Sequence, residues 1–268
     1  MLQQMADPLR DRRAASFSQV TDEYARSRPG YPDRAVTWLA PGTGSQMLEL
    51  GCGTGALTAA LADRGHHVVA SDLSRSMLDH VSGRLPVHVV EARAERLPFR
   101  ACTFDYVVAA QAYHWFDASV ALPEIARVLR DDGELALIWN LRDENVPWVR
   151  ELAELVGSEG SPATSLDEGP LGSSPLFGPL RSEEYGHWQA LDRDSLLELV
   201  SSLSYVAAMP ADERASVLDQ VRALYARHTR GSERLRMRYT TVCFRTRVDR
   251  STLPPDPPDE GDVILRFR

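Results

Sequence analysis

The sequence predicts an α/β fold with a mostly parallel sheet, an antiparallel last strand and a helical insertion before that strand. Three observations predict it. In the first half of the chain, short apolar runs alternate with amphipathic stretches, which is the pattern of strand–helix–strand units around a parallel sheet. A glycine-rich turn directly follows the first apolar run. After residue 156 the alternation stops, and a segment rich in Gly, Ser and Pro begins the second half.

The elements of the first half follow from this alternation. Two helices are predicted before the first strand, at residues 14–28 and 33–39. The predicted strands are 46–50, 67–71, 87–91, 104–110 and 133–140, and the helices between and after them are 55–64, 75–84, 118–129 and 147–156. The spacing of Leu57 and Leu61, and of Met77 and Val81, suits helices that lie on a sheet.

The second half contains fewer elements and longer connections. Residues 157–181 are predicted to form a long loop, of the kind that often acts as a lid. A strand (183–190), two helices (194–207 and 211–228) and an extended segment (236–248) follow, the last of these returning to the sheet as its seventh, antiparallel strand. We therefore divide the chain into a core (1–156), an insertion that covers the substrate (157–230), a return to the sheet (231–248) and an acidic, Pro-rich tail (249–268).

Composition excludes several classes of function. The net charge of −8 argues against a protein that follows a phosphate backbone, and we expect no nucleic-acid partner. All 30 basic residues are arginine, which codon bias explains. The absence of lysine also excludes a P-loop lysine, a Schiff-base lysine and the Tyr-x-x-x-Lys pair of short-chain dehydrogenases. Cys52, Cys102 and Cys243 are too few and too scattered for a disulfide framework or a zinc site, so we expect free thiols and no metal.

The chain shows no sign of a membrane or secretory destination. No apolar run approaches the roughly 20 residues of a membrane helix. The first residues lack the apolar stretch of a secretory signal, so we expect a cytoplasmic protein without a membrane partner.

The central motif is the turn Gly51-Cys52-Gly53-Thr54-Gly55, between the first strand and a helix. Glycines at these positions permit a tight turn and let a ligand approach the backbone. The Gly-x-Gly-x-Gly spacing differs from the Gly-x-Gly-x-x-Gly fingerprint of dinucleotide-binding proteins. The turn alone is therefore weak evidence for any one ligand.

Two later positions add weight to this motif. Asp72 ends the second strand, where a carboxylate can accept hydrogen bonds from both ribose hydroxyls of an adenosine-containing ligand. The alternative is a helix N-cap, although Ser74 is better suited to that role. After the third strand, the Ala94 N–H and the Glu95 carboxylate are candidates to bind the adenine edge, unless this segment is simply a solvated, charged loop.

Taken together, these motifs resemble a known family. The ordered set LELGCGTG, SDLS, ARAERLPF and FDYVVAAQAYHWFD is similar to the class I, Rossmann-like methyltransferases of the methyltransferase-11 type. The segment Tyr24–Pro32 and the run NLRDE at residues 140–144 extend the similarity, which covers about residues 17 to 150. The resemblance implies S-adenosylmethionine as cofactor and a small-molecule acceptor as substrate.

The resemblance also implies roles for individual residues. It places Tyr24 and Arg28 near the methionine carboxylate, Gly51, Cys52, Gly53 and Gln111 along the methionyl part, and Leu73 and Met77 on either side of adenine. Two alternatives stay open, because Arg28 is also compatible with an ordinary surface arginine, and Leu73 and Met77 with helix core.

The segment His114-Trp115-Phe116 follows the fourth strand, at the edge of the sheet where ligands of open α/β folds bind. Methyl transfer from a sulfonium is an in-line displacement that mainly needs proximity and a dry site. His114 is the best candidate for a base if the acceptor must lose a proton, and a positioning role is equally compatible with the sequence. Trp115 and Phe116 are interpreted either as a wall of the acceptor pocket or as core.

Two other functions are compatible with part or all of these motifs. An NAD-dependent oxidoreductase would share the first strand–helix–strand unit and Asp72, and a catalytically idle S-adenosylmethionine-binding protein would share the whole site. Nucleic-acid methylation is disfavoured, since the chain lacks an Asp/Asn-Pro-Pro-Tyr-like tetrapeptide after strand four and a Pro-Cys nucleophile. The spacing of Asp117, Asp143 and Glu144 does not suggest a metal site. The sequence is compatible with secondary metabolism but leaves open the acceptor, the methylated atom and the oligomeric state.

Overall fold

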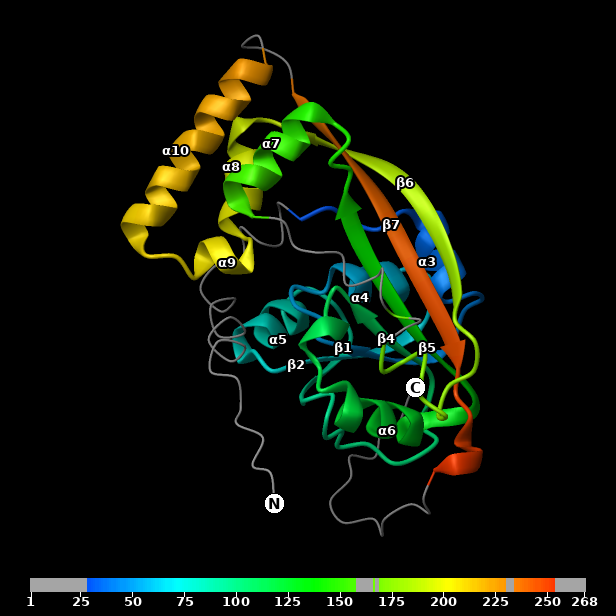
Figure 1. Ribbon diagram of the computed structural model, residues 1–268. Helices are drawn as coiled ribbons and strands as arrows, with labels where there is room; N and C mark the ends of the chain where they lie inside the picture. The colour runs from blue at the N-terminus through cyan, green and yellow to red at the C-terminus, as the bar shows by residue number, and fades with distance from the viewer. Residues whose placement is uncertain (1–27, 158–165, 167–168, 230–233, 254–268) are drawn as a thin grey trace, which may run out of the picture. The chain divides into compact units, whose positions relative to one another are not determined.

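The fold is known from a computed structural model that describes residues 28–157, 166, 169–229 and 234–253. Within these residues, seven strands form one sheet in the order β3-β2-β1-β4-β5-β7-β6 (Figure 1). The strands are β1 (Gln46–Leu50), β2 (His67–Asp72), β3 (His88–Glu91), β4 (Phe104–Ala110), β5 (Leu129–Arg142), β6 (Arg181–Leu191) and β7 (Leu235–Arg247). Strands β1 to β5 pair in parallel, and β7 runs antiparallel between β5 and β6. The predicted sheet with its antiparallel last strand is confirmed.

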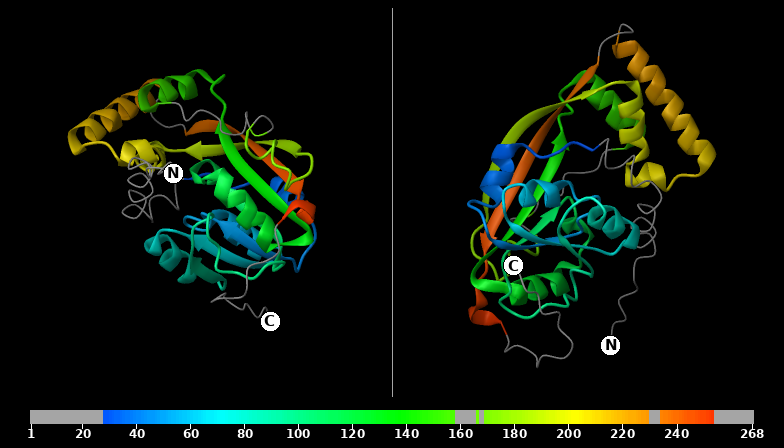
Figure 2. Two further views of the ribbon diagram at one scale, coloured as in Figure 1. Left: turned by 60° about the horizontal axis from the view of Figure 1, so that its bottom comes forward. Right: turned by 180° about the vertical axis from the view of Figure 1, so that it is seen from behind.

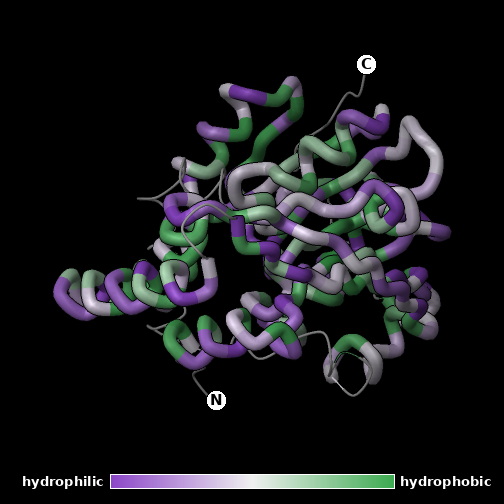
Figure 3. The backbone as a smooth tube through the Cα atoms, turned by 90° about the horizontal axis from the view of Figure 1, so that it is seen from above, coloured by the Kyte–Doolittle hydropathy of each residue, from purple (hydrophilic) through white to green (hydrophobic). Residues whose placement is uncertain are grey.

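The described helices fall close to their predicted positions. They are α3 (Asp33–Leu39), α4 (Ala56–Ala62), α5 (Arg75–Ser82), α6 (Ala118–Val128), α7 (Pro147–Val156), α8 (Arg193–Ser201), α9 (Ser204–Ala207) and α10 (Ala211–His228), with short 3₁₀ helices η2 (Tyr113–Trp115) and η4 (Arg250–Thr252). Hydrophobic and hydrophilic residues alternate along the helices (Figure 3), as expected for helices with one buried face. The predicted helix 14–28 lies outside the described residues, apart from Arg28.

The chain divides into two compact units. The first, here called the core unit, comprises the described residues among Gly30–Leu141, Ser161–Tyr185 and Thr241–Arg268. In it, α3, α4 and α5 pack on one face of the sheet and α6 packs on the other (Figure 2). Alternation along β1 creates this division, because Met47 packs toward α3 and α4 whereas Leu48 packs toward α6.

The second unit, here called the helical unit, comprises the described residues among Met1–Pro29, Arg142–Gly160 and Gly186–Thr240. Its core joins α7, α8 and α10 to the first half of β7 through side chains such as Leu152, Leu196, Val221 and Met237. The boundary before Arg142 places α7 in this unit, whereas the division drawn from the sequence ended the core at residue 156. That the insertion covers the substrate stays a prediction.

Two elements differ from their predicted extents for identifiable reasons. Strand β5 begins at Leu129, before the predicted start at Gly133, because Leu129 already pairs with Phe104 of β4. The predicted helix 194–207 is interrupted after Ser201, and α9 begins at Ser204. The Ser202 carbonyl accepts a hydrogen bond from Nη2 of Arg28 at 3.0 Å, a partner from a distant part of the sequence.

Candidate functional site

The topology of the sheet indicates where a ligand would bind, beyond the carboxyl ends of its strands. The chain builds β1, β2 and β3 outward in one direction and then returns to place β4 on the other side of β1. In open α/β sheets, ligands bind at such a switch point, beyond the carboxyl ends of the strands. The turns after β1 and β4 flank this switch point, so the residues of these two turns form the candidate site.

The turn after β1 has three glycines with positive φ, but only one of them borders empty space. A Cβ on Gly51 would lie 2.7 Å from the Cβ of Ala112, and one on Gly55 would lie 3.0 Å from Cγ2 of Val81. A Cβ on Gly53, where φ is +53°, would meet no protein atom within 4 Å. Packing therefore accounts for Gly51 and Gly55, whereas the open side of Gly53 is available to a ligand.

Asp72 joins the end of β2 to this turn. Its Oδ2 accepts a hydrogen bond from the Gly53 N–H at 2.9 Å, and its Oδ1 accepts one from the Ser74 N–H at 2.8 Å. Burial raises the pKa of Asp72 above its ordinary value, although these hydrogen bonds partly oppose the shift. Each carboxylate oxygen keeps further acceptor capacity, so the side chain can also receive ribose hydroxyls. Ser74 occupies the N-cap of α5, but its side chain makes no capping hydrogen bond.

The neighbours of Asp72 and Gly53 differ in what they can offer a ligand. Leu73 is 47% exposed, which is unusual for a large apolar side chain, whereas Met77 is 2% exposed. Of this pair, only Leu73 presents apolar surface in the structure. The Cys52 thiol is buried with Ala70, and the Cys52 N–H donates to the Ser71 carbonyl at 2.9 Å.

The loop between β3 and β4 (residues 92–103, the β3–β4 loop) contains both residues expected at the adenine edge. Ala94 is buried. Oε1 of Glu95 accepts a hydrogen bond from the N–H of Asp117, the N-cap residue of α6, at 2.8 Å. Through Oε1, Glu95 thus ties the loop to the start of α6, and Oε2 takes no part in this hydrogen bond.

The turn after β4 begins with backbone strain. Gln111 has φ +52°, one of two non-glycine residues with positive φ among those the structure describes. Such strain often occurs at functional sites. The chain then forms η2, in which His114 is exposed and its ring lies 4.8 Å from that of Trp115, centroid to centroid. Phe116 packs partly against the core, edge-on to Tyr113, so His114 is the most accessible of the three predicted acceptor residues.

Comparison with known proteins agrees with this geometry. A family model described as a methyltransferase domain matches residues 48–137. An uncharacterised methyltransferase of Mycobacterium tuberculosis (strain ATCC 25618 / H37Rv) is 41% identical over 86% of this chain and 94% of its own length. The chain belongs to the class I S-adenosylmethionine-dependent methyltransferases.

Solved structures support the same fold for this methyltransferase. A type II methyltransferase candidate from Anaeromyxobacter dehalogenans aligns with a TM-score of 0.59 and 25% identity, over 82% of this chain and 97% of that one. A phosphoethanolamine N-methyltransferase 2 from Haemonchus contortus, solved with phosphomonomethylethanolamine and S-adenosylhomocysteine, aligns with a TM-score of 0.54. Its identity is 16%, over 90% of this chain and 60% of that one. The family uses S-adenosylmethionine, so the NAD-dependent alternative is set aside.

Two residues, Tyr24 and Arg28, are expected near the methionine carboxylate. Tyr24 lies outside the described residues. Arg28 belongs to the helical unit, where its guanidinium donates to the Ser202 carbonyl. Their roles in this methyltransferase stay predictions.

Glu49, a carboxyl group that is fully buried in β1, was not among the residues predicted for the site. Its Oε2 accepts a hydrogen bond from Oγ1 of Thr58 in α4 at 2.5 Å, and its Oε1 has no hydrogen-bond partner among the described residues. Burial raises the pKa of Glu49 to about 8. The signal in the sequence was an acidic residue at the centre of an apolar strand, two residues before Gly51.

Neither a membrane-spanning helix nor a metal-binding cluster occurs among the residues that the structure describes. No helix in that part of the chain is long and apolar enough to cross a membrane. Likewise, no group of three or more His, Cys, Asp or Glu side chains within it is arranged to hold a metal ion.

Proposed function

We propose that this methyltransferase binds S-adenosylmethionine across the carboxyl ends of β2, β1 and β4 and methylates a small molecule beside His114. The observation that carries the proposal is the pairing of Gly53 with Asp72. At Gly53 an added Cβ would meet no protein atom within 4 Å, and Oδ2 of Asp72, at the end of the neighbouring strand β2, lies 2.9 Å from the Gly53 nitrogen. This combination suits a ligand that has vicinal hydroxyls and also an extended part that lies close to the protein backbone.

Each residue of the site has a role in this proposal. Asp72 accepts hydrogen bonds from the ribose hydroxyls, the exposed Leu73 lies against one face of adenine, and the Ala94 N–H donates to the adenine edge. Gly51, Gly53 and Gln111 border the methionyl part. When bound, S-adenosylmethionine supplies a methyl group on a positively charged sulfur, which is an excellent leaving group.

At the acceptor, the chain needs to do little beyond positioning. Trp115 and His114 hold the acceptor in line and exclude water, which are the main requirements for methyl displacement. For a hydroxyl acceptor, His114 accepts the proton that the oxygen loses. For an amine or carbon acceptor, His114 orients the loop instead.

Calorimetric titration tests the cofactor assignment. S-adenosylmethionine and S-adenosylhomocysteine should bind with a stoichiometry of about one, and NADH should give no heat of binding. Absence of binding by both sulfur compounds would refute the proposed function.

Turnover distinguishes a methyltransferase from a protein that only binds the cofactor. Release of S-adenosylhomocysteine is measured with a panel of small hydroxyl, amine and carbon acceptors, and the Asp72→Ala variant serves as the negative control. Binding without acceptor-dependent release across the panel would favour the idle alternative.

A further inference from the structure

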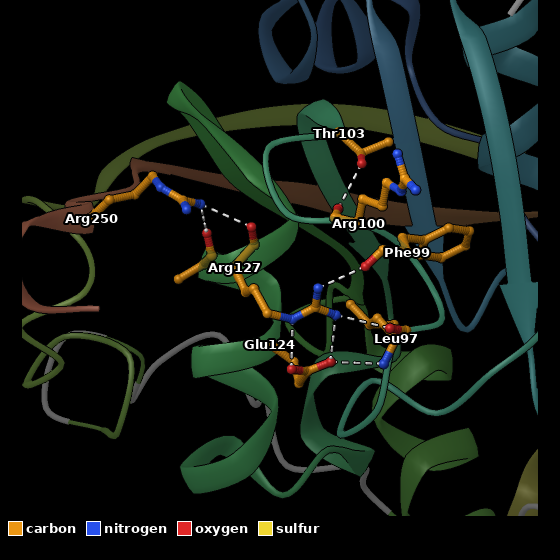
Figure 4. Close-up of polar contacts among 8 residues, drawn as sticks. Leu97, Phe99, Arg100, Thr103, Glu124, Arg127 and Arg250 are labelled. Carbon is orange, nitrogen blue, oxygen red and sulfur yellow. Dashed lines mark hydrogen bonds and ion pairs between the residues drawn. The ribbon is translucent and has the colours of Figure 1, made fainter. Parts of the chain in front are cut away.

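The β3–β4 loop is fastened to α6 by two side chains of that helix (Figure 4). Oε2 of Glu124 accepts a hydrogen bond from the Leu97 N–H at 2.9 Å. Arg127 donates from Nη2 to the Leu97 carbonyl at 2.9 Å and from Nη1 to the Phe99 carbonyl at 2.7 Å. Both backbone polar groups of Leu97 are therefore satisfied by α6 rather than by solvent or sheet.

Glu124 and Arg127 also fix each other. Nε of Arg127 donates to Oε1 of Glu124 at 2.9 Å, and Nη2 donates to Oε2 at 3.0 Å. The Glu124 side chain is 24% exposed and the Arg127 side chain is 14% exposed. A two-pronged arginine–carboxylate pair has a defined geometry, and here the pair also binds the backbone of the loop at Leu97 and Phe99. The pair acts as a rigid clamp on Leu97 and Phe99.

The clamp lies close in sequence to the residues that we assign to the adenine edge. Ala94 precedes Leu97 by three residues, and a tight turn joins them, in which the Arg96 N–H donates to the Arg93 carbonyl at 3.1 Å. Glu95, which lies within this turn, is tied to α6 through the Asp117 N–H. On the other side of Ala94, the Ala92 N–H donates to the Asp72 carbonyl at 3.3 Å. The backbone at Ala94 is consequently held between this bond to β2 and the attachments of Glu95 and Leu97 to α6.

We propose that Glu124 and Arg127 are positioning residues for the cofactor, which hold the β3–β4 loop so that the Ala94 N–H meets the adenine ring. The inference rests on the proposed function, since it concerns the adenine end of the same site. A displacement of about 1 Å at a binding group can cost a large part of its contribution. Loss of the clamp therefore weakens adenine recognition even where the fold survives.

The chain offers a matched control in Arg250, which binds the C-terminal end of α6 from outside the helix. Its Nη1 donates to the carbonyls of Ala126, Arg127 and Leu129 at 2.9, 2.9 and 2.8 Å, and its side chain is 18% exposed. Arg250 thus resembles Arg127 in burial and in binding backbone carbonyls, three against two, but its carbonyls belong to the end of α6 and the start of β5 and not to the β3–β4 loop. Replacing it costs stability without releasing the loop.

The test compares Arg127→Met, Glu124→Ala, Glu124→Gln and Arg250→Met with the unaltered chain. Dissociation constants are measured by calorimetry for S-adenosylhomocysteine and for S-inosylhomocysteine, whose ring N1 carries a hydrogen and cannot accept from the Ala94 N–H. Thermal melting is measured alongside. The ratio of the two dissociation constants reports adenine recognition separately from stability.

We expect Arg127→Met and Glu124→Ala to bind S-adenosylhomocysteine at least about tenfold more weakly, with a ratio that falls toward one. Glu124→Gln retains an acceptor for the Leu97 N–H and should stay within about threefold of the unaltered chain. Arg250→Met should melt earlier and keep both the affinity and the ratio.

The inference is overturned if Arg127→Met and Glu124→Ala melt earlier, as Arg250→Met does, but keep the ratio of the unaltered chain. If Arg127→Met does not fold, the comparison of Glu124→Ala with Glu124→Gln decides alone. Failure of the unaltered chain to bind S-adenosylhomocysteine would refute the proposed function, and the inference with it. That result differs from the one in which the unaltered chain binds S-adenosylhomocysteine but the clamp variants keep its ratio of dissociation constants.

Discussion

Gly53→Ala is the sharpest test of the site, because the structure separates its effect on the protein from its effect on the ligand. The added Cβ would meet no protein atom within 4 Å. The variant should therefore fold, and a methyl group should then stand where the cofactor approaches the turn. At Gly51 the same change would drive a Cβ to 2.7 Å from Ala112, so it would report packing instead.

The magnitude follows from two contributions. Holding alanine at φ +53° costs about 1–2 kcal/mol of folding free energy, since L side chains disfavour the left-handed region. One extra methyl group forced into close contact costs about 1–3 kcal/mol. Against the ligand, this second cost corresponds to a dissociation constant raised by about 5- to 150-fold.

Gly42→Ala supplies the control. Gly42 has φ +83°, and its added Cβ would also meet nothing within 4 Å, but it lies in the connection before β1 and away from the switch point. Both variants should melt a few degrees earlier, about 2–4 °C for each kcal/mol. Only Gly53→Ala should bind S-adenosylhomocysteine more weakly in calorimetric titration. Equal affinities for the two variants would show that no ligand approaches Gly53.

Three further predictions concern side chains. Asp72→Ala should weaken S-adenosylmethionine binding by about 1–3 kcal/mol through lost charge-assisted hydrogen bonds, whereas Asp79→Ala on the exposed side of α5 should not, as measured by calorimetry. His114→Asn should lower turnover by about 10²–10⁴-fold with a hydroxyl acceptor and leave cofactor affinity unchanged; a loss below about tenfold would leave His114 a positioning role only. Burial alone would raise the pKa of Glu124, but hydrogen bonds from Arg127 and Leu97 lower it below its ordinary value of 4.5. The clamp's stabilisation should therefore be complete above about pH 4.5 and be lost as the pH falls through the lower folded value, which denaturant titrations of the unaltered chain and Glu124→Gln at several pH values would detect.

Periodicity located the helices because each of them buries one face, and short apolar runs located the central strands because these bury both faces. The ranges predicted for α3, α7 and α10 agree with the structure, since their apolar spacing and flanking residues act locally. β5 extends further than predicted because the segment Arg130-Asp131-Asp132-Gly133 has the composition of a turn, whereas in the structure Leu129 and Glu134 on either side of it pair with β4. The predicted helix 194–207 is interrupted between α8 and α9, where the Ser202 carbonyl accepts a hydrogen bond from Arg28, a residue remote in sequence that gave no local signal.

The candidate site was predictable where chemistry follows directly from chain order. The glycine turn and Asp72 each come right after a strand, so parallel pairing brings them together, and the structure shows the hydrogen bond between Gly53 and Asp72. Glu49 was missed because a carboxyl group inside a sheet gives no motif spacing, and its meaning depends on the burial that raises its pKa.

The residues that link the parts of the site are the hardest to find from sequence, and α6 shows why. The acceptor segment leads into Asp117 at the start of this helix, and Glu95 of the β3–β4 loop binds the Asp117 N–H. Two turns further along, Glu124 and Arg127 hold the same loop. One helix therefore holds both the loop of the expected adenine contact and the end of the His114 segment, although none of its own residues lies in the motifs that predicted the site. Motifs record residues that touch ligands, so a helix that only holds two such segments in place is recognised through its hydrogen bonds. Variants at Glu124 should therefore affect binding at a site that Glu124 does not contact.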